Sequence, residues 1–350
     1  MSYFIPFSLE GPMLPRKTPG LKRAAALLLL LIATPAAAAE LKPQTVAAFD
    51  RYATLTEQRI DAAATPLWID GLPPAERQRA LGEVRAGDTW ITSLETRDAG
   101  RDIPVPDGLL HHWLGTAFIP GVTTAQAVAL LQDYNRHAQV YAPVVQQSRL
   151  LTGDGEHFTI FLRFYQKKGI TVIVNTNHDA RFTTVTPQHV KATIRTTRVA
   201  QVEDAGTPSE RELPVGSDGG YLWRLNTYWR FVERDGGTYV QCESLTLTRG
   251  IPTGLGWLIR PFITSIPRES LVFTLEKTRE ALLARWKIVT IAAWPRIANG
   301  RRPPVSARRA SGAPSGRPSP RSSSASASWR CSAPSSSRAR AATRPAAAAR

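Results

Sequence analysis

Large apolar residues alternate with other residues along much of the middle of this chain. From Phe158 to Phe164 every second residue is large and apolar, and a period of two is typical of a β-strand whose two faces differ. Strand-like runs of this kind are expected at residues 88–96, 111–119, 144–151, 157–165, 170–176, 181–186 and 190–202. Short turns such as TGDGE and QKKG separate several of them, so the strands after Pro143 are expected to pair in antiparallel order.

The strongest pattern is a hairpin at residues 221–248, which read YLWRLNTYWRFVERDGGTYVQCESLTLT. Asp235 and Gly236 belong to the residue types that tolerate a positive φ, so they predict a two-residue turn. That turn sets the register, with the expected pairs Trp229–Cys242, Tyr228–Glu243 and Arg230–Gln241. A one-residue bulge would change all of these pairs.

The two faces of this hairpin differ in chemistry. One is expected to carry Trp223, Leu225, Trp229, Phe231, Val240 and Cys242, and the other Arg224, Asn226, Tyr228, Arg230 and Glu243. In the simpler interpretation, the aromatic face is core and the polar face is solvated. In the alternative interpretation, the aromatic side chains leave room for a ligand and a few polar groups orient it.

Helical patterns flank the strands. Helices are expected at residues 42–64, after the prolines of GLPPAERQRAL, and after Thr123, which has capping-box spacing to Gln126. A long helix is expected at residues 265–286, with an apolar stripe made by Leu271, Val272, Leu275, Leu282, Leu283 and Trp286. Since the stripe needs an apolar surface and the sheet supplies one, the pattern predicts an α+β fold. In this fold the helices are expected on one face of a curved antiparallel sheet.

The N-terminus resembles a secretory signal. A basic leader is followed by an apolar run at residues 24–33 and by small residues at Ala37 and Ala39. About ten apolar residues are too few to cross a bilayer, which takes roughly 20. We therefore predict a signal peptide over residues 1–39 and a secreted or periplasmic protein. An uncleaved membrane anchor is the alternative, and Met13 is a second candidate start.

The C-terminus has a different composition from the rest. Residues 301–350 are almost entirely Ala, Arg, Ser, Pro and Gly, and no acidic residue follows Glu280. A segment with so little apolar surface cannot offset its ordering entropy, so residues 289–350 are expected to be disordered. A shifted reading frame of a GC-rich gene is the other explanation for this tail, since these five residue types have GC-rich codons.

Charge and cysteine content exclude some classes of function. The formal net charge is +16, but the excess lies at the two ends and residues 40–288 are close to neutral. No specific nucleic-acid partner is therefore expected for the body, and the tail would attract phosphate only nonspecifically. Cys242 is the single cysteine of the body, so an internal disulfide is not expected there.

The order of the elements and the wording of several segments resemble a known superfamily. The segments are HHWLGTAFIPG, LLQDYNRH, VEDAGTPSERELPVG, GYLWRLNTYWRFVERDGG and SIPRESL. Over about residues 45–286 the chain resembles the START-like, or Bet v 1-like, superfamily, which includes polyketide cyclase-like proteins, and in particular secreted bacterial members of unestablished role. The resemblance implies a helix-grip fold whose cavity, between the sheet and the last helix, holds a lipid, sterol or polyketide. The tail departs from the family completely.

This resemblance divides the chain into four parts. The expected order is a signal peptide (1–39), an N-terminal helical extension packed on the main domain (40–105), a START-like helix-grip domain (106–288) and the tail (289–350). The expected function is binding or carriage of a hydrophobic small molecule, with transient membrane contact allowed and no cofactor.

The candidate cavity-lining residues come from the faces described above. They are Trp113, Tyr134, Arg163, Trp223, Asn226, Tyr228, Trp229, Phe231, Arg249 and Leu275. Arg163 and Arg249 are candidates to hold a carboxylate or phosphate headgroup, although an ion pair with Glu243 or another acid is the simpler expectation.

Metal and nucleotide motifs are not found in the sequence. There is no HExxH, CxxC, GxSxG or Walker A pattern, and Gly254-x-Gly256 has no third glycine. His111 and His112 are adjacent on a strand, so they point to opposite faces and cannot share a metal. One is expected in the core and the other on the surface.

Two other classes of function stay open at this point. The second class is a cyclase or dehydratase enzyme that acts on a polyketide-like substrate in the same cavity, with Asp133, His137 and Tyr228 as the candidate acids and bases. Asp133, Tyr134 and His137 are expected on one helical arc, as a surface cluster or as an acid/base group at the cavity mouth. The third class is an envelope interaction module whose cavity is closed by side chains.

Overall fold

The computed structural model describes residues 39–168, 170–250 and 256–293, and in the last helix it describes the side chains of residues 265–284. The predicted signal peptide lies outside these residues apart from Ala39. The predicted tail also lies outside them, apart from residues 289–293, which continue the last helix beyond the predicted boundary at 288.

Helices lie before the sheet, after its first long strand and at the end. They are α2 (Pro43–Asp61), η1 (Trp68–Gly71), α3 (Pro74–Ala86), α4 (Thr124–Gln132), η2 (Tyr134–Arg136), α5 (His137–Val140) and α6 (Gly256–Ala293). The capping box predicted for Thr123 and Gln126 starts α4, with Gln126 N donating to Thr123 Oγ1 at 3.3 Å. The predicted last helix is confirmed, although α6 begins at Gly256 and includes Pro267 in its interior.

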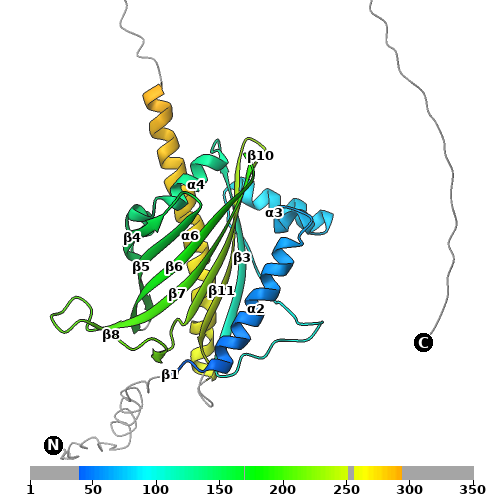
Figure 1. The fold of residues 1–350 in the computed structure, drawn as a ribbon. Helices are drawn as coiled ribbons and strands as arrows, with labels where there is room; N and C mark the ends of the chain where they lie inside the picture. Colours follow the sequence, from blue (N-terminus) through cyan, green and yellow to red (C-terminus); the bar gives the residue numbers. More distant parts are fainter. Residues whose placement is uncertain (1–38, 169, 251–255, 294–350) are drawn as a thin grey trace, which may run out of the picture. The chain divides into compact units, whose positions relative to one another are not determined.

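The strands form one large antiparallel sheet and one small pair (Figure 1). They are β1 (Ala39–Glu40), β2 (Trp90–Ser93), β3 (Gly108–Pro120), β4 (Val145–Gly153), β5 (His157–Lys168), β6 (Ile170–Thr186), β7 (His189–Glu203), β8 (Arg211–Glu212), β9 (Ser217–Asp218), β10 (Arg224–Arg234) and β11 (Gly237–Arg249). The order in the large sheet is β2-β3-β11-β10-β7-β6-β5-β4, with β8 on β7. The two runs predicted at 170–176 and 181–186 are one continuous strand, β6.

The hairpin of β10 and β11 has the predicted turn and register. Asp235 and Gly236 have φ values of 57° and 76°, as a type I′ turn requires. The pairs Trp229–Cys242, Tyr228–Glu243 and Arg230–Gln241 all form. No bulge interrupts the pairing, so the register follows directly from the two-residue turn.

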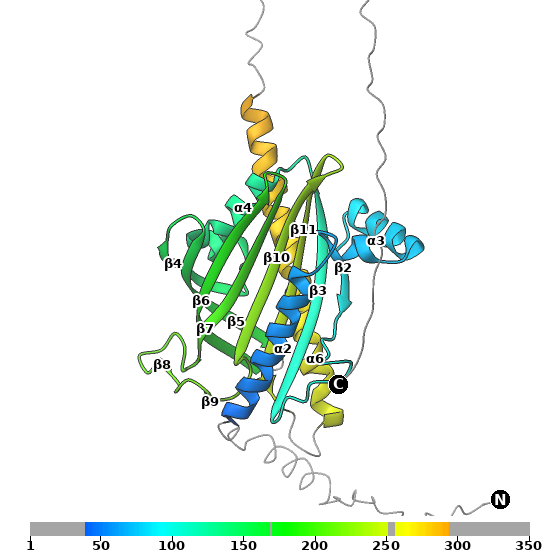
Figure 2. The same ribbon diagram turned by 45° about the vertical axis from the view of Figure 1, so that its right-hand side comes forward.

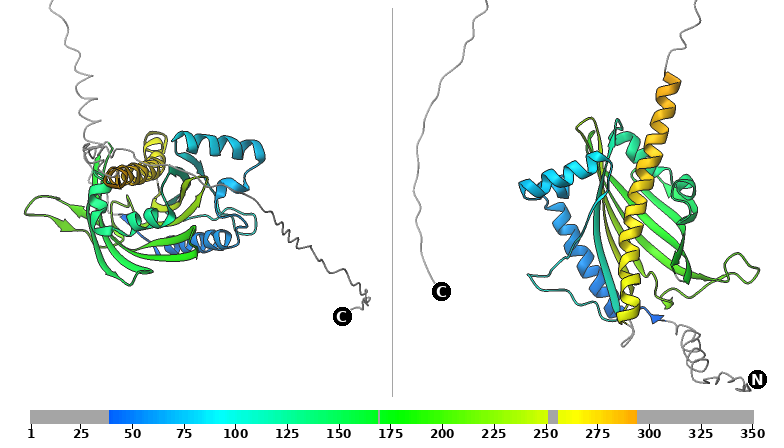
Figure 3. Two further views of the ribbon diagram at one scale, coloured as in Figure 1. Left: turned by 90° about the horizontal axis from the view of Figure 1, so that it is seen from above. Right: turned by 180° about the vertical axis from the view of Figure 1, so that it is seen from behind.

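Helix α6 lies across the concave inner face of the sheet (Figure 3). It packs most closely on β3, where a Cβ atom built at Gly115 would lie 2.6 Å from Leu275 Cδ1. A side chain at position 115 would force Leu275 to move, so the glycine permits this close approach. The predicted α+β helix-grip arrangement is confirmed by the strand order and by this position of α6.

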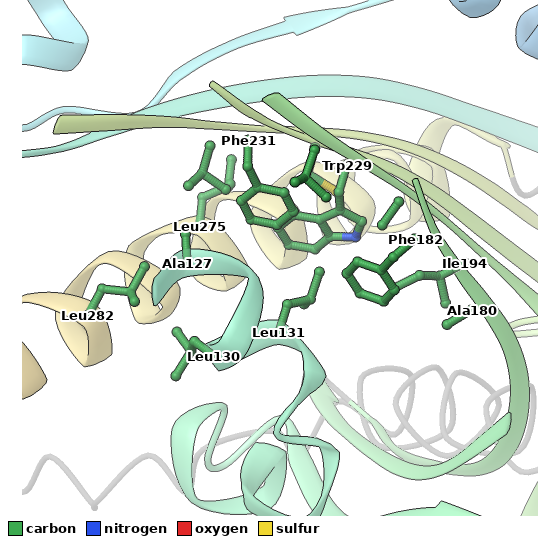
Figure 4. Close-up of a cluster of buried hydrophobic side chains, with 14 of the residues drawn as sticks. Ala127, Leu130, Leu131, Ala180, Phe182, Ile194, Trp229, Phe231, Leu275 and Leu282 are labelled. Atoms are coloured by element: carbon green, nitrogen blue, oxygen red, sulfur yellow. The ribbon is translucent and has the colours of Figure 1, made fainter. Parts of the chain in front are cut away.

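Part of the space between α6 and the sheet is filled by a solid apolar core (Figure 4). Trp229 and Phe231 lie side by side there with ring centroids 6.2 Å apart and an interplanar angle of 6°. Leu131 and Phe182 lie near them, and Leu275 of α6 is fully buried. Large side chains therefore fill this end of the space between α6 and the sheet.

The N-terminal extension covers the outer face of the sheet, where α2 lies along β3 (Figure 2). The cluster beneath α2 contains Phe49, Tyr52, Trp223, Tyr228 and Leu247. The expectation that the polar face of the hairpin is solvated is therefore wrong, since Tyr228, Arg230 and Glu243 are all buried. Trp223 also lies in this cluster, because it precedes β10 and does not follow the alternation of that strand.

A buried polar network joins α2 to β3 and β11. His112 Nε2 lies 2.7 Å from Glu243 Oε1, and His112 Nδ1 lies 3.0 Å from the Tyr52 hydroxyl. Arg59 also pairs with Glu243. Burial lowers the pKa of His112, and the hydrogen bond to Glu243 opposes this shift. The network lets the sheet bury charged groups under α2, because each of them has a partner.

The paired histidines differ from the prediction. His111 and His112 do point to opposite faces, but both are buried. His111 Nε2 lies 3.3 Å from Thr248 Oγ1 on the inner side, whereas His112 lies under α2. The surface position expected for one of them does not exist, because α2 covers it.

Candidate ligand-binding cavity

A cavity of about 940 Å³ lies between α6 and the inner face of the sheet. It exists because α6 approaches β3 closely at Gly115 and stands away from β5, β6 and β7, which curve around it. Most of its wall is apolar, and the apolar lining includes Leu131, Val145, Ile160, Leu162, Phe164, Val172, Val174, Ile194, Leu225, Trp229, Ile266, Leu271 and Phe273. Its size is within the range of small-molecule sites.

An apolar space of about 940 Å³ that is left without atoms costs free energy, because the side chains that line it lose packing contacts. The space therefore holds water or a guest. Water needs polar partners, which the apolar wall does not supply over most of its area.

The inner row of β6 shows which end of the cavity is open. Ile170 lies at the turn after β5 and is 53% exposed, whereas Val174 and His178 are buried. Beyond His178 the row continues with Ala180 and Phe182, which belong to the solid core and do not line the cavity. The mouth is therefore at the β5–β6 turn, and the inner end is at His178.

Two cationic side chains line the mouth. Lys168 Nζ is 2.7 Å from Glu269 Oε1 and 2.7 Å from Ser265 Oγ, so its charge is paired with α6. Arg249 Nη1 donates to the carbonyl oxygen of Gly219 at 3.3 Å. Within the part of the chain that the structure describes, no carboxylate forms an ion pair with Arg249.

Hydroxyl groups follow the cavity along β11. Ser244, Thr246 and Thr248 face inward, as does Thr227 of β10. Trp229 Nε1 donates to Thr227 Oγ1 at 3.1 Å. The wall formed by β10 and β11 is thus more polar than the opposite wall, which is formed by β5, β6 and β7.

The inner end carries His137, Tyr141 and His178. Burial lowers the pKa of His178 to about 3 and that of His137 to about 4, and it raises the pKa of Tyr141 to about 12. All three side chains are therefore neutral at neutral pH. They are hydrogen-bonding groups in an otherwise apolar end.

Cys242 also lines the inner end. Burial raises the pKa of its thiol well above the ordinary value, and the nearby Glu243 acts in the same direction. Since the thiolate is the nucleophilic form, Cys242 behaves here as a small apolar residue.

Only two of the predicted cavity residues line the cavity, Trp229 and Arg249. Tyr134, Phe231 and Leu275 are buried in the core next to it, and Trp113 packs against that core while partly buried. These four were placed on the correct side of the sheet, but the cavity does not reach them.

The other four predicted residues lie elsewhere. Trp223, Asn226 and Tyr228 are buried away from the cavity, Trp223 and Tyr228 in the cluster under α2, and the Tyr228 hydroxyl donates to Glu57 Oε1 at 2.9 Å. Arg163 forms a bidentate pair with Glu210 at 2.8 and 3.0 Å and holds the pKa of that carboxyl at about 2. The simpler expectation for Arg163, an ion pair, is therefore confirmed.

The predicted acid/base candidates do not meet. His137 lines the cavity, whereas Asp133 and Tyr228 do not. Tyr134 contacts His137 with ring centroids 5.0 Å apart, but it is part of the core. The cyclase or dehydratase alternative is left with His137 alone from its original set.

His178 and Tyr141 were missed by the sequence analysis. His178 lies in the gap, residues 177–180, between the strands predicted at 170–176 and 181–186. Treating 170–186 as one strand would have placed His178 on the same inner row as Val172 and Val174. Tyr141 had no periodic signal, because it follows the short helix α5.

No family model and no curated protein matches the sequence. Solved structures with a similar fold include a STAR-related lipid transfer protein from Xanthomonas axonopodis, with 16% identity, 55% of this chain and 98% of that chain covered, and a TM-score of 0.34. The Zhui aromatase/cyclase from Streptomyces sp. R1128 has 12% identity, with 51% of this chain and 96% of that chain covered, and a TM-score of 0.35. Human STARD10 has 12% identity, 64% and 86% coverage, and a TM-score of 0.34. A START superfamily protein from Mycobacterium smegmatis is also among them.

No group of three or more His, Cys, Asp or Glu side chains in the described part of the chain is arranged to hold a metal ion. None of the described helices is long and apolar enough to cross a membrane.

Proposed function

We propose that this protein binds a hydrophobic small molecule of lipid-like character in the cavity between α6 and the sheet. The observation that carries the proposal is the cavity itself, about 940 Å³ with a mainly apolar wall. A module whose cavity is closed by side chains does not fit this volume. In the proposal the protein acts after export, as the predicted signal peptide implies.

Native mass spectrometry after mild extraction tests this proposal directly. We expect a bound small molecule that is released on unfolding, and we expect the emptied protein to take up a fluorescent fatty acid. Protein that is reproducibly empty and that takes up no fluorescent fatty acid would contradict the proposal.

Arg249 is expected to hold the charged end of an anionic ligand at the mouth. Replacing Arg249 by Gln should weaken binding of a long-chain fatty acid about tenfold, because a charge-assisted hydrogen bond contributes about 1.5–3 kcal/mol. Binding of the matching fatty alcohol should not change. Isothermal titration with both probes measures the difference.

The matched control for this experiment is Arg149→Gln. Arg149 lies on β4 and stacks over the Phe161 ring at 4.5 Å, away from the cavity lining. If both variants weaken the fatty acid equally, the effect comes from overall charge. An equal loss for acid and alcohol in Arg249→Gln would mean that Arg249 only shapes the mouth.

A further inference from the structure

His178 has a defined tautomer. Thr176 Oγ1 donates its hydrogen to the carbonyl oxygen of Leu162 at 2.9 Å. The same oxygen lies 2.8 Å from His178 Nε2 and can only accept there. His178 Nε2 therefore carries the hydrogen, and in the neutral ring Nδ1 is a bare acceptor.

His137 has the same arrangement. Its Nε2 lies 3.0 Å from the carbonyl oxygen of Leu131, which can only accept a hydrogen bond. Nε2 therefore donates, and Nδ1 of the neutral ring is again an acceptor. Two different backbone carbonyls thus fix the tautomers of two imidazoles that line one end of the cavity.

The hydroxyl hydrogen of Tyr141 is also engaged in a hydrogen bond. The Thr278 hydroxyl donates to the carbonyl oxygen of Thr274 at 2.8 Å. The Tyr141 hydroxyl, 3.0 Å from Thr278 Oγ1, must then be the donor to Thr278. Its oxygen is left with acceptor capacity only, so His137, Tyr141 and His178 each have their one polar hydrogen already engaged within the protein.

We infer that the inner end of the cavity binds a hydroxyl group at the far end of the ligand, with His178 and His137 as the acceptors. The inference rests on the proposed function. The inference adds to the proposed function that the ligand carries a hydrogen-bond donor at the end that lies deepest in the cavity.

The alternatives fit this end less well. A carboxylate would meet three acceptors and no free donor among them, and Trp229 Nε1, an N–H of the lining, is already bonded to Thr227. A plain methyl end would leave the buried acceptors without partners, which costs free energy. An ammonium group would lose its hydration in a site that has no carboxylate among the lining residues.

Pairs of probes that differ by one hydroxyl group test the inference. Dodecanoate, tetradecanoate and hexadecanoate are each compared with the ω-hydroxylated acid of the same length. At the length that binds best, we expect the hydroxylated acid to bind about tenfold more tightly to the unaltered protein. His178→Phe, which removes the acceptor, should reverse this preference.

Val172→Ala is the matched control, because Val172 lines the cavity on the same strand but near the mouth. It should keep the preference for the hydroxylated acid. Equal binding of both acids to the unaltered protein would overturn the inference and leave the proposed function intact. Failure of every probe to bind would overturn both.

Nitrogen-15 NMR of the imidazole rings gives a readout that does not depend on a variant folding. In the free protein we expect a protonated Nε2 and a bare Nδ1 for His178, and we expect the Nδ1 signal to move when the hydroxylated acid binds. A protonated Nδ1 in the free protein, or no change on binding, would overturn the inference.

Discussion

Replacing Val174 by Trp abolishes ligand binding, with a loss of affinity of about a hundredfold or more. Val174 is buried on the inner row of β6 and lines the cavity between its mouth and His178. An indole at this position occupies the path that a ligand must take. Fold stability should stay the same or rise, because the new apolar surface is buried in existing space at about 25 cal/mol per Å².

The same substitution at Val185 is the control. Val185 lies on the same strand but is 50% exposed and outside the cavity, so Val185→Trp should bind like the unaltered protein. Fluorescent fatty acid titration measures affinity, and thermal unfolding measures stability. A Val174→Trp protein that melts normally and still binds would show that the ligand occupies another site.

Acidification from pH 7.5 to pH 5 lowers the free energy of unfolding by several kcal/mol. Burial lowers the pKa of His111 and His137 to about 4 and that of His178 to about 3. In the unfolded chain these rings titrate near 6.5. Below pH 6.5 these rings bind protons in the unfolded state but stay neutral in the folded state. The stability that is present above pH 6.5 is therefore lost as the pH falls toward 4. Each ring accounts for about 2 kcal/mol at pH 5.

The surroundings of these rings support that direction. His178 faces His137, whose charge would repel its own, and the Asp133 carboxylate only partly opposes the burial of His137. His111 faces the Thr248 hydroxyl. The window down to pH 5 lies above the range in which the carboxylates with lowered pKa, such as Glu210, become protonated.

Urea unfolding at the two pH values measures this effect. His111→Gln should reduce the loss of unfolding free energy between the two pH values by about 2 kcal/mol, because it removes one of the rings with a lowered pKa. His111 is suitable for this test because it does not line the cavity. His157→Gln is the control variant, because the His157 side chain is 40% exposed and lies outside the group of buried histidines. An unchanged slope in His111→Gln would contradict the assignment.

Short-range patterns were sufficient for most of the fold. The Asp235-Gly236 turn set the register of β10 and β11, the Thr123 capping box set the start of α4, and helical spacing placed Leu271, Leu275 and Leu282 of α6 against the sheet. These features depend on neighbours within a few residues, so the sequence contains them directly.

Burial of the outer face could not be derived from alternation. The alternation places Tyr228, Arg230 and Glu243 on a face that is typical of solvent exposure. They are buried only because α2, more than 150 residues earlier in the chain, lies over them. Arg59 of α2 supplies a partner for Glu243 that no local pattern pairs with it.

The sequence by itself determined that a curved antiparallel sheet holds one long amphipathic helix, because strand and helix periodicities and turn residues act locally. Only the tertiary structure decided which inward side chains meet a cavity and which meet the core. That choice depends on how far α6 stands from each strand, and the distance is set by packing at Gly115 and Leu275. It separated Trp229 and Arg249 from Phe231 and Leu275, and it brought His178 and His137 to one end of the same space.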